Sequence, residues 1–523
     1  MVLAQQTSDT SDDVRGVRGI IGPPGTGKTT EISRLVERVW KANGELGHPA
    51  MVCSLTVAAA SEAAGRDLPI DHRMIGTLHS HAYRALGGSI EIATDAKLAG
   101  WNQEAPMRWR VSADGARDES VEIDLPEEEG SSFGPIIQAH TLCRQKMLTR
   151  GLWPSEVQEF DAAWTKWKRE EGLKDFTDLI EDATTDTEAP MNSPSVMFVD
   201  EAQDFSQLPD MFQAIDPDRL RVLSQSYRVP ARIHEVAVKW ASTLSSSTKQ
   251  DYLPTQQRGI VEFRHELSYM RPQYTIRLIR QERDAGRSVM VTTACGYMLQ
   301  EIIDTLRRAG LPFCNPWRRK AAVWNPLAPR KGVTGLDRLK ALVDPLAEDK
   351  MWTKRQVSLW MEVLRTDKLL RRGAKRKVAA WKDVNEELAF EELRDLFVDI
   401  IAFDKFWSVM MEQTDVVDKV KWWQWWCLET KSSSIEFPCW ATYNGNYKKL
   451  YEEPQIYVGS IHSFKGSECD TVILFPDLSP RGTQAFHQRG QQRDSVIRQF
   501  YVGMTRAKKK LFIAQPDSRF KCV

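Results

Sequence analysis

The chain has 523 residues, enough for about three or four domains that each bury a core. Its 71 acidic and 71 basic residues balance, so a nucleic-acid partner would have to bind a local basic groove. Its 8 cysteines include no C-x-x-C pair, which argues against a zinc site and a disulfide framework. No apolar run is long enough to span a bilayer, which argues against a membrane-spanning protein. The polar N-terminus predicts no signal peptide, and we expect a protein of the reducing cytoplasm.

Residues 1–16 are predicted to form a polar tail, and 17–21 a strand that leads into the segment IIGPPGTGKTT. This segment has the spacing of a phosphate-binding loop, in which glycines let backbone N–H groups surround a polyphosphate while a lysine reaches the β/γ oxygens. We expect ATP to bind here with Mg²⁺, and Thr29 to be a ligand of the metal. The helix at 31–40 points its positive N-terminal end at the same anion. The expected nucleotide-binding residues are Gly22, Gly25, Thr26, Gly27, Lys28, Thr29 and Thr30.

Two further apolar segments, 50–55 and 195–199, are typical of parallel strands buried on both faces. Residues 75–86 are expected to be a strand end that turns into a helix. From 87 to 172 the pattern changes to an acidic, irregular stretch followed by helical segments, which indicates an inserted subdomain. Its predicted helices are 138–148 and 157–170.

An acidic pair follows the strand at 195–199. A phosphate-loop enzyme needs one carboxylate that holds Mg²⁺ and a second that deprotonates the attacking water. Asp200 and Glu201 are predicted to take these two roles. The alternative is a solvated turn or a helix cap, which the upstream phosphate loop disfavours.

A second α/β pattern begins near 221–223 and is interrupted by a helical stretch at 327–430 that is rich in Lys, Arg and Trp. We interpret this stretch as a second insertion. The predicted strands and helix of the second pattern are 288–292, 298–309 (the helix), 455–461, 470–475 and 510–514.

Four segments in this order resemble the UvrD/Rep-like group of superfamily 1 DNA helicases. They are DEAQD (200–204), SYR (226–228), IHSFKGSE (461–468) and YVGMTRAK (501–508). The resemblance implies an α/β fold with two RecA-like parallel-sheet domains of the P-loop NTPase class, each with a mainly helical insertion. It also implies translocation 3′ to 5′ on single-stranded DNA, with association to the nucleoid in a bacterial or viral host.

Combined with the pattern along the chain, the resemblance predicts the domain boundaries. The first RecA-like domain is expected at 17–86 and 173–220, its insertion at 87–172, the second RecA-like domain at 221–326 and 455–523, and its helical insertion at 327–454.

The resemblance also assigns roles at the nucleotide. It gives Gln203 to the γ-phosphate or its water, Glu468 to the ribose, and Arg228 and Arg506 to the triphosphate from the second domain. Arginines contributed across a cleft would make hydrolysis depend on closure. Gln5 or Gln6 lies at a plausible distance before Lys28 for the family's adenine-reading glutamine, but without the usual apolar neighbours.

Nucleic-acid contacts are expected from hydroxyls, helix-start amides and cationic side chains, which bind phosphate without reading sequence. Those predicted are Thr56, Thr77, His79, Ser80, His462 and Lys465. Thr77 can equally be a helix cap. DFTDLI (175–180) matches a further family segment, in which Phe176 is expected either to support the DNA path or to be core.

Tryptophans at 422, 423, 425 and 426 could form a stacking platform beside Lys419 and Lys421. At helical spacing they cover too much of the circumference to share one face, so at least half are predicted to be core. The same reasoning applies to Trp164 and Trp167.

One family motif is missing. Between the acidic pair and SYR, the family normally has a further strand and a glycine-aspartate-x-x-glutamine segment, whose glutamine senses the γ-phosphate. Only residues 205–222 lie there, with no such segment and with Gln213 in the middle. The first sheet should therefore be one strand short or be finished by another segment, with an edge to cover.

We therefore predict an ATP-dependent DNA helicase or translocase that binds single-stranded DNA and duplex junctions, with weak coupling between ATP and DNA. Two alternatives stay open. One is a non-motor, ATP-gated DNA clamp or scaffold, and the other is an RNA-directed helicase.

Overall fold

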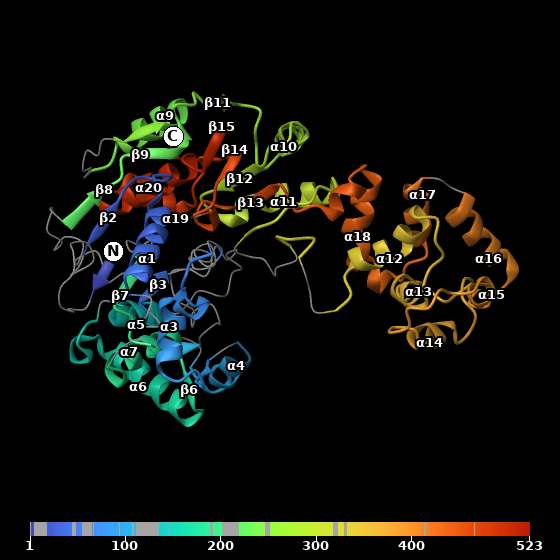
Figure 1. Cartoon of the computed structure of the whole chain (residues 1–523), viewed down its shortest axis with the longest axis horizontal. Coiled ribbons are helices and arrows are strands. Elements are labelled where there is room, and N and C mark those ends of the chain that lie inside the picture. Colours follow the sequence, from blue (N-terminus) through green and yellow to red (C-terminus); the bar gives the residue numbers. More distant parts are fainter. Residues whose placement is uncertain are drawn as a thin grey trace. The chain divides into compact units, whose positions relative to one another are not determined.

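The computed structural model describes residues 2–4, 18–43, 49–54, 65, 67–93, 95–106, 109–110, 135–145, 147–188, 192–200, 219–245, 252–316, 323–328, 332–412, 415–464 and 466–522. The chain divides into two compact units (Figure 1). Unit 1 comprises Met1–Val238 and Ser246–Gly259, and unit 2 comprises Lys239–Ser245 and Ile260–Val523.

The main sheet of unit 1 has four strands in the order β1-β7-β3-β4. They are β1 (Val2–Ala4), β7 (Val196–Asp200), β3 (Ala50–Ser54) and β4 (Ile75–Thr77). β3 is paired in parallel with both β7 and β4. The apolar face of helix α1 (Lys28–Asn43) packs on this sheet through Ile32, Val36 and Val39. These elements confirm the predicted parallel strands and the helix after the phosphate loop.

β1 corrects one prediction. Residues 2–4 were assigned to a polar tail, but they pair antiparallel with β7, where Val2 is opposite Phe198 and Ala4 is opposite Val196. The triplet Val-Leu-Ala is apolar, and an unpaired edge beside β7 exposes backbone N–H and C=O groups that a short strand can satisfy. The sheet is thus finished by another segment, which is one of the two outcomes that the missing strand predicts.

Two smaller parallel pairs complete the strands around the phosphate loop. β2 (Gly19–Ile21) pairs with β8 (Leu220–Val222), and β9 (Gln225–Pro230) pairs with β10 (Leu253–Thr255). Helix α9 (Ala231–Ala241) follows β9 and runs from unit 1 into unit 2. The predicted boundary at 220 thus differs from the observed division, because β8, β9 and β10 belong to unit 1.

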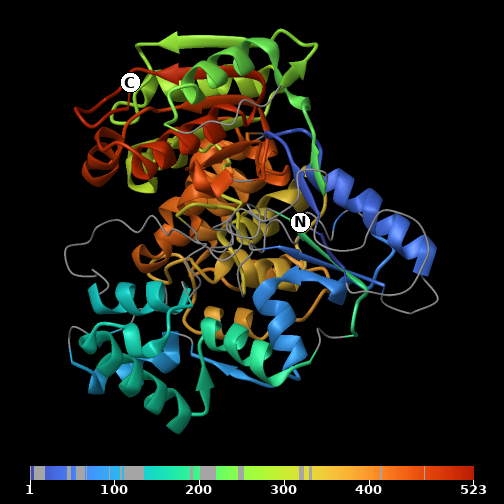
Figure 2. The same cartoon turned by 90° about the vertical axis from the view of Figure 1, so that its left-hand side faces the viewer.

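The insertion in unit 1 has its own core of aromatic and aliphatic side chains, in which Trp101, Phe160 and Trp164 contact one another edge to face or stacked. Its helices are gathered in one group (Figure 2, teal). The elements from 72 to 186 are η2 (His72–Met74), α3 (Leu78–Ala85), β5 (Glu91–Ile92), α4 (Asp95–Glu104), α5 (Pro135–Gln145), η4 (Arg150–Leu152), α6 (Ser155–Glu170), β6 (Leu173–Lys174) and α7 (Phe176–Asp186).

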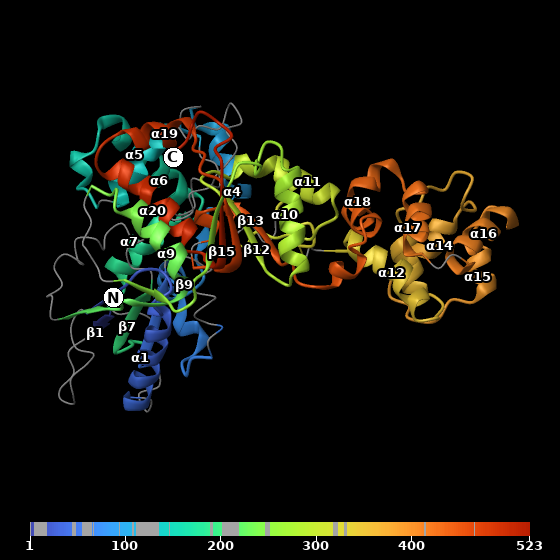
Figure 3. The ribbon, with the colours of Figure 1, turned by 90° about the horizontal axis from the view of Figure 1, so that it is seen from above.

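Unit 2 contains a five-stranded, all-parallel sheet in the order β11-β15-β14-β12-β13. Helices α10 and α11 lie on one side of it and α20 on the other (Figure 3). Neighbouring residues of one strand serve the two sides, because Ile473 packs in the α10–α11 core while Leu474 approaches Gly503 of α20. The elements are β11 (Ile260–Arg264), α10 (Gln273–Asp284), β12 (Val289–Thr293), η7 (Gly296–Leu299), α11 (Gln300–Arg308), β13 (Ile456–Ser460), η10 (His462–Phe464), β14 (Cys469–Leu474), α19 (Pro480–His487), α20 (Gln491–Met504) and β15 (Ala507–Ala514).

The predicted second insertion is a helical bundle around the fully buried indoles of Trp352, Trp360 and Trp423 (Figure 1, yellow to orange). Gly310, which ends α11 with a φ of +59°, allows close approach of the bundle, because a Cβ there would lie 2.3 Å from the Cα of Ala441. The bundle consists of α12 (Gly335–Ala347), α13 (Lys354–Met361), α14 (Ala374–Ala379), α15 (Phe390–Arg394), α16 (Ile400–Trp407), η8 (Ser408–Glu412), α17 (Val416–Trp425), α18 (Glu429–Tyr443) and η9 (Tyr447–Tyr451). Among the described residues, no helix combines the length and apolarity that crossing a membrane requires.

Candidate nucleotide site

The phosphate loop is folded by hydrogen bonds within itself. The Lys28 ammonium donates to the carbonyl oxygens of Gly22, at 2.8 Å, and Pro23, at 3.3 Å. The Thr26 hydroxyl donates to the same Pro23 oxygen at 2.9 Å, and the Glu31 amide donates to Gly27 at 2.8 Å. Lys28 therefore lies over the loop, and its ammonium would have to exchange these two carbonyls for phosphate oxygens when a nucleotide binds.

Two glycines of the loop adopt a left-handed backbone conformation that L side chains rarely take. Gly25 has a φ of +79° and Gly27 a φ of +81°. Gly25 also has no room for a side chain, since a Cβ there would lie 2.5 Å from the Cβ of Arg228. These positions explain the glycines that the sequence motif requires.

A second layer of contacts reaches the loop from the segment around β9 and β10. Tyr227 donates its amide to the Gly25 carbonyl at 2.7 Å. The Pro24 carbonyl accepts the Tyr252 hydroxyl at 2.9 Å and the Ser226 hydroxyl at 3.5 Å. Ser226 is buried, and its oxygen also accepts the Val229 amide at 3.0 Å. Each carbonyl from Gly22 to Gly25 thus has a donor within unit 1.

A hydroxyl and a carboxylate that are far apart in sequence meet beneath the loop. The Thr29 hydroxyl donates to Asp200 Oδ2 at 3.1 Å, and Asp200 is buried at the end of β7. This pair fits Mg²⁺, which takes one or two protein oxygens and completes its shell with phosphate and water oxygens. Among the described residues no group of three His, Cys, Asp or Glu side chains gathers as a metal cluster. Glu201 and Gln203 lie outside the described residues, as does Gln213.

Tyr227 lies beside the loop, although the sequence analysis noted SYR as a motif and assigned this tyrosine no role. Its side chain is 77% exposed, and its ring lies beside Gly27, whose Cβ would be 3.9 Å from the Tyr227 Cδ2 atom. An exposed ring next to a phosphate loop can stack on a nucleobase. Its neighbour Arg228 was predicted to reach the triphosphate from the second domain, but it lies in unit 1 against Gly25, and that placement is corrected.

The predicted residues of the second α/β domain lie in unit 2. Arg506 is buried, and its guanidinium donates to the carbonyls of Val502, at 3.0 Å, and Ser467, at 3.2 Å. It thereby ties the end of α20 to the residue before Glu468. The Glu468 carboxylate pairs with Lys508 at 3.1 Å, and both side chains are exposed.

Two of the predicted nucleic-acid contacts form the start of α3. The Thr77 hydroxyl accepts the Ser80 amide at 3.2 Å, so Thr77 is the helix cap. The Ser80 hydroxyl donates to the Thr77 carbonyl at 2.8 Å and accepts Arg84 at 2.9 Å. Gly76 is needed beneath them, because a Cβ there would lie 2.3 Å from the Ser80 hydroxyl. Thr56 and Lys465 lie outside the described residues.

The remaining predicted contacts involve rings. The His79 ring meets the half-buried Phe176 ring edge to face, with centroids 5.4 Å apart. In unit 2, His462 Nδ1 lies 3.2 Å from the Gln499 amide nitrogen. The structure thus brings His79 together with Phe176 of DFTDLI, two positions that the family resemblance selected separately.

A buried ionic network fixes the helix start that carries Phe176. Asp175 and Asp178 form a capping box at α7. Lys168 lies 2.6 Å from Asp175, and Arg144 lies 3.1 Å from Asp175 and 2.8 Å from Asp178. Burial opposes the charge on Asp175, but these two cations hold the pKa of its carboxyl well below the ordinary value.

The prediction that at least half of the four tryptophans at 422–426 belong to the core is confirmed. Trp423 is fully buried and its indole N–H donates to the Trp360 carbonyl at 2.9 Å, while Trp422 and Trp426 pack against the same core. Trp425 is 73% exposed. In the first insertion Trp164 is buried and stacks on Trp167 with centroids 5.2 Å apart.

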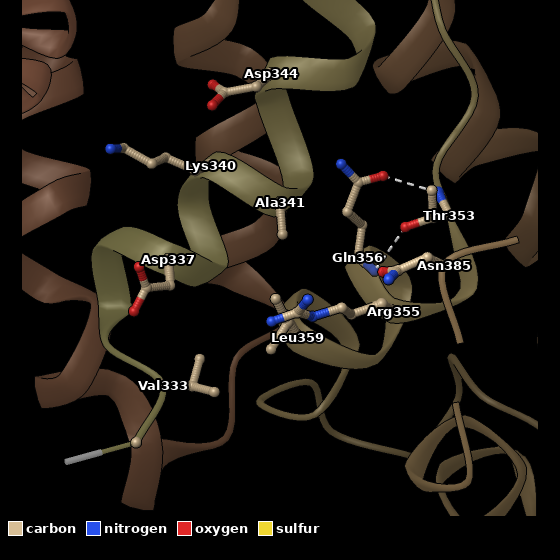
Figure 4. Close-up of a pocket in the computed structure, with 11 residues that line it drawn as sticks. Val333, Asp337, Lys340, Ala341, Asp344, Thr353, Arg355, Gln356, Leu359 and Asn385 are labelled. Atoms are coloured by element: carbon tan, nitrogen blue, oxygen red, sulfur yellow. Dashed lines mark hydrogen bonds between the residues drawn. The ribbon is translucent and has the colours of Figure 1, made fainter. Parts of the chain in front are cut away.

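A hollow of about 680 Å³ in unit 2 contains none of the predicted site residues. It lies between α12 and α13 of the helical bundle, where Asp337, Lys340 and Asp344 project from α12 (Figure 4). On the other side, Thr353 and Gln356 close a capping box. Charges of both signs line this hollow.

Two family models match the chain. Residues 8–224 match a model described as an AAA domain, and residues 455–514 match one described as a UvrD-like helicase C-terminal domain. The first match spans the phosphate loop and Asp200, and the second spans Glu468 and Arg506. Both matches are consistent with the UvrD/Rep-like superfamily 1 helicases that the sequence motifs resemble.

The two matched domains imply a nucleotide hydrolase or helicase of the P-loop NTPase class, with nucleotide and nucleic acid as ligands. A search of curated proteins found no match. The observed fold and the AAA-domain match agree on a mixed α/β protein that has parallel sheets and an NTP-binding loop.

Proposed function

We propose that this chain is an ATP-dependent DNA helicase or translocase that moves 3′ to 5′ on single-stranded DNA. Two RecA-like domains, one in each unit, would form its motor. The observation that carries the proposal is the pre-folded phosphate loop with the Thr29–Asp200 pair beneath it, in a chain that resembles the UvrD/Rep-like family. Such a loop binds nucleotide, and the family uses nucleotide hydrolysis to move on nucleic acid.

In the proposed reaction, Lys28 leaves the carbonyls of Gly22 and Pro23 and binds the β/γ-phosphate oxygens. Thr29 and Asp200 would hold Mg²⁺, which would supply positive charge next to the phosphate oxygens. Glu201 accepts a proton from the attacking water, and Gln203 orients that water or senses the γ-phosphate. The exposed ring of Tyr227 stacks on the base.

Arginine completes the proposed transition-state site. Phosphoryl transfer passes through a loose state whose charge is spread over the γ-phosphate oxygens, which a planar guanidinium stabilises well. Arg228, beside the loop, and Arg506, in YVGMTRAK, are the proposed donors. Glu468 would bind the ribose.

The decisive experiment measures ATP hydrolysis by the purified full chain with and without a thymidine oligonucleotide. Hydrolysis that requires Lys28, with oligonucleotide binding at low salt, supports the motor. The Lys28→Ala variant is expected to lose nearly all turnover while its thermal unfolding stays close to wild type, since a half-exposed loop lysine contributes little to stability. Turnover retained by folded Lys28→Ala protein would refute the proposal.

A second candidate is a non-motor clamp that binds DNA in an ATP-gated manner. The missing glycine-aspartate-x-x-glutamine segment favours it, because only 205–222 separate the acidic motif from SYR. ATP and oligonucleotide binding with no turnover would select the clamp. A parallel series with a uridine RNA oligonucleotide tests the third candidate, an RNA-directed helicase, which requires tighter binding to RNA than to DNA.

A further inference from the structure

A second hollow, of about 470 Å³, lies in unit 2 where the end of α9 meets α19 and α20. We propose that this hollow binds a segment of single-stranded nucleic acid, a contact that rests on the proposed function and that none of the helicase motifs provides. Its lining residues are Thr243, Ser245, Phe486, His487, Arg489 and Arg493. None of them belongs to the predicted nucleotide or nucleic-acid residues.

The first argument is charge. Residues 478–493 contain three arginines and one histidine but no aspartate or glutamate, whereas the acidic and basic residues of the whole chain are equal in number. Neither Arg489 nor Arg493 makes an ion pair with any described residue. Unpaired cations grouped at a concave surface attract a polyanion.

The acidic residue nearest in sequence does not neutralise this group. Asp494 is 3% exposed, and its carboxylate accepts the Ser245 amide at 2.9 Å. Its other oxygen faces Arg498 at 4.0 Å, on the next turn of α20. Asp494 thus holds the α9 end against α20, and the two arginines of the hollow keep their positive charge for a ligand.

The second argument is the aromatic wall. Phe486 stacks on Trp240 with centroids 6.0 Å apart and planes within 7° of parallel. Trp240 is itself fixed, because its indole N–H donates to the Ile497 carbonyl at 2.9 Å. Phe486 remains partly exposed beside Trp240 and Arg493, so a base would stack on the uncovered part of the ring or on the Arg493 guanidinium, and such stacking accepts any base.

The third argument is preorganisation. Arg493 donates to the Thr243 carbonyl at 2.6 Å, and its guanidinium carbon lies 5.5 Å from the centre of the Phe486 ring. These contacts hold the guanidinium plane in place before any ligand binds, and guanidinium carries five N–H donors, of which Thr243 uses one. A guanidinium group held in this way loses less conformational freedom on binding phosphate oxygens than a flexible surface arginine does.

The combination of arginines with an aromatic ring favours nucleic acid over a simple anion, because an isolated phosphate would use the cations and leave the ring without a partner. It also favours nucleic acid over an acidic protein segment, which offers carboxylates but no bases. Single strands expose both phosphate and base faces, and a duplex hides the base faces.

The test measures binding of a fluorescent thymidine oligonucleotide to the full chain by anisotropy, over a series of salt concentrations. Arg489→Ala should weaken binding about 3- to 10-fold and reduce the salt dependence by about 0.7 in log–log slope, the value for one lost phosphate contact on a single strand. Phe486→Leu should weaken binding with no change in slope. Arg271→Ala is the matched control, since Arg271 is an exposed arginine of the same unit outside the hollow, and thermal unfolding verifies the fold of each variant.

The outcomes separate this proposal from the proposed function. Failure of the wild-type chain to bind the oligonucleotide at low salt would refute both. If the wild-type chain binds the oligonucleotide and the Arg489→Ala and Arg271→Ala variants bind it with equal affinity, the proposed binding site in the hollow is overturned and the proposed function is not. Competition by a polyglutamate peptide as effective as that of unlabelled oligonucleotide would also overturn it, in favour of an acidic protein ligand.

Discussion

The hydroxyl of Tyr252 donates a hydrogen bond of 2.9 Å to the carbonyl oxygen of Pro24, a residue 228 positions earlier in the chain. The bond ties the phosphate loop to β10, and the Tyr252 ring is in turn held edge to face against His234 with centroids 4.5 Å apart. The shape of the loop therefore depends on a residue that no helicase motif includes.

Removal of this hydroxyl should loosen the loop without changing its chemistry. Tyr252→Phe is expected to raise the KM for ATP about 3- to 10-fold, the equivalent of one hydrogen bond, with a smaller change in kcat. The matched control is Tyr83→Phe, since the Tyr83 hydroxyl has no hydrogen bond to the part of unit 1 that the structure describes. Equal KM values for the two variants would show that the loop keeps its shape without Tyr252.

Glu201→Gln should separate nucleotide binding from hydrolysis. The amide cannot accept the proton of the attacking water, whereas Lys28, Thr29 and Asp200 still hold the nucleotide. We expect tight, ATP-dependent DNA binding with almost no turnover, measured by filter binding and phosphate release. An equal loss of ATP binding would contradict the assignment of Glu201 as the base.

Arg506→Ala should reduce hydrolysis by about 10³-fold or more if the guanidinium stabilises the transition state. Arg506→Lys should rescue little, because an ammonium does not reproduce the planar fork. The buried hydrogen bonds to Val502 and Ser467 mean that both variants also lose stability, so hydrolysis is measured well below each variant's Tm. Near-normal turnover by Arg506→Ala would leave this arginine with a structural role only.

Glu282 predicts how unit 2 responds to acid. Burial opposes its charge, but donors from Arg287, Lys510 and Thr471 lower the pKa of Glu282 to about 2 from an ordinary 4.5. A lowered folded-state pKa stabilises the fold above pH 4.5, and this contribution is lost as the pH falls toward 2.

Glu282→Gln should accordingly destabilise unit 2 by about 3 kcal/mol at neutral pH, because it removes the charge of a buried carboxylate that two half-buried cations, Arg287 and Lys510, pair with. The difference in Tm from wild type should shrink at pH 3. Glu453→Gln, an exposed glutamate whose carboxylate has no partner among the described residues, is the control. A pH-independent difference would show that the charge of Glu282 is not what stabilises the fold.

The missing glycine-aspartate-x-x-glutamine segment predicts weak coupling. Coupling needs an element whose two arrangements both sites bias, and the family's usual element is absent between 204 and 226. We expect ATP and single-stranded DNA to bind, but DNA to stimulate hydrolysis weakly and unwinding to be poor. Strong DNA-stimulated turnover with processive 3′ to 5′ unwinding would contradict this, and Gln203 or Gln213 would then be the first residues to test as replacement sensors.

The sequence predicted elements whose signals are local. The phosphate loop and the strand-to-helix turn at 75–86 carry their own glycines, periodicity and cap, and both formed where expected. By contrast, Val2–Ala4 is a three-residue run with no periodicity, and its partner strand lies about 190 residues away in the chain, so its pairing with β7 could not be predicted.

Long-range contacts within the site were equally hidden. Nothing near Tyr252 in the sequence marks it as a donor to Pro24, and the contact of Arg228 with Gly25 depends on how β9 returns to the loop. Motif order instead suggested that Arg228 belongs to the second domain. The hollow beside Phe486 also depends on tertiary packing, since it joins residues about 240 positions apart.

The course of helix α9 has a consequence for dissecting the protein. The chain leaves unit 1 after Val238, within this helix, returns at Ser246 and leaves again after Gly259. No single cut therefore separates the units, and a fragment that ends at Val238 would lack β10 and the Tyr252 hydroxyl. A truncated nucleotide-binding module has to extend to Gly259, and it then carries the seven residues Lys239–Ser245 without the α20 residue Asp494 that binds the Ser245 amide.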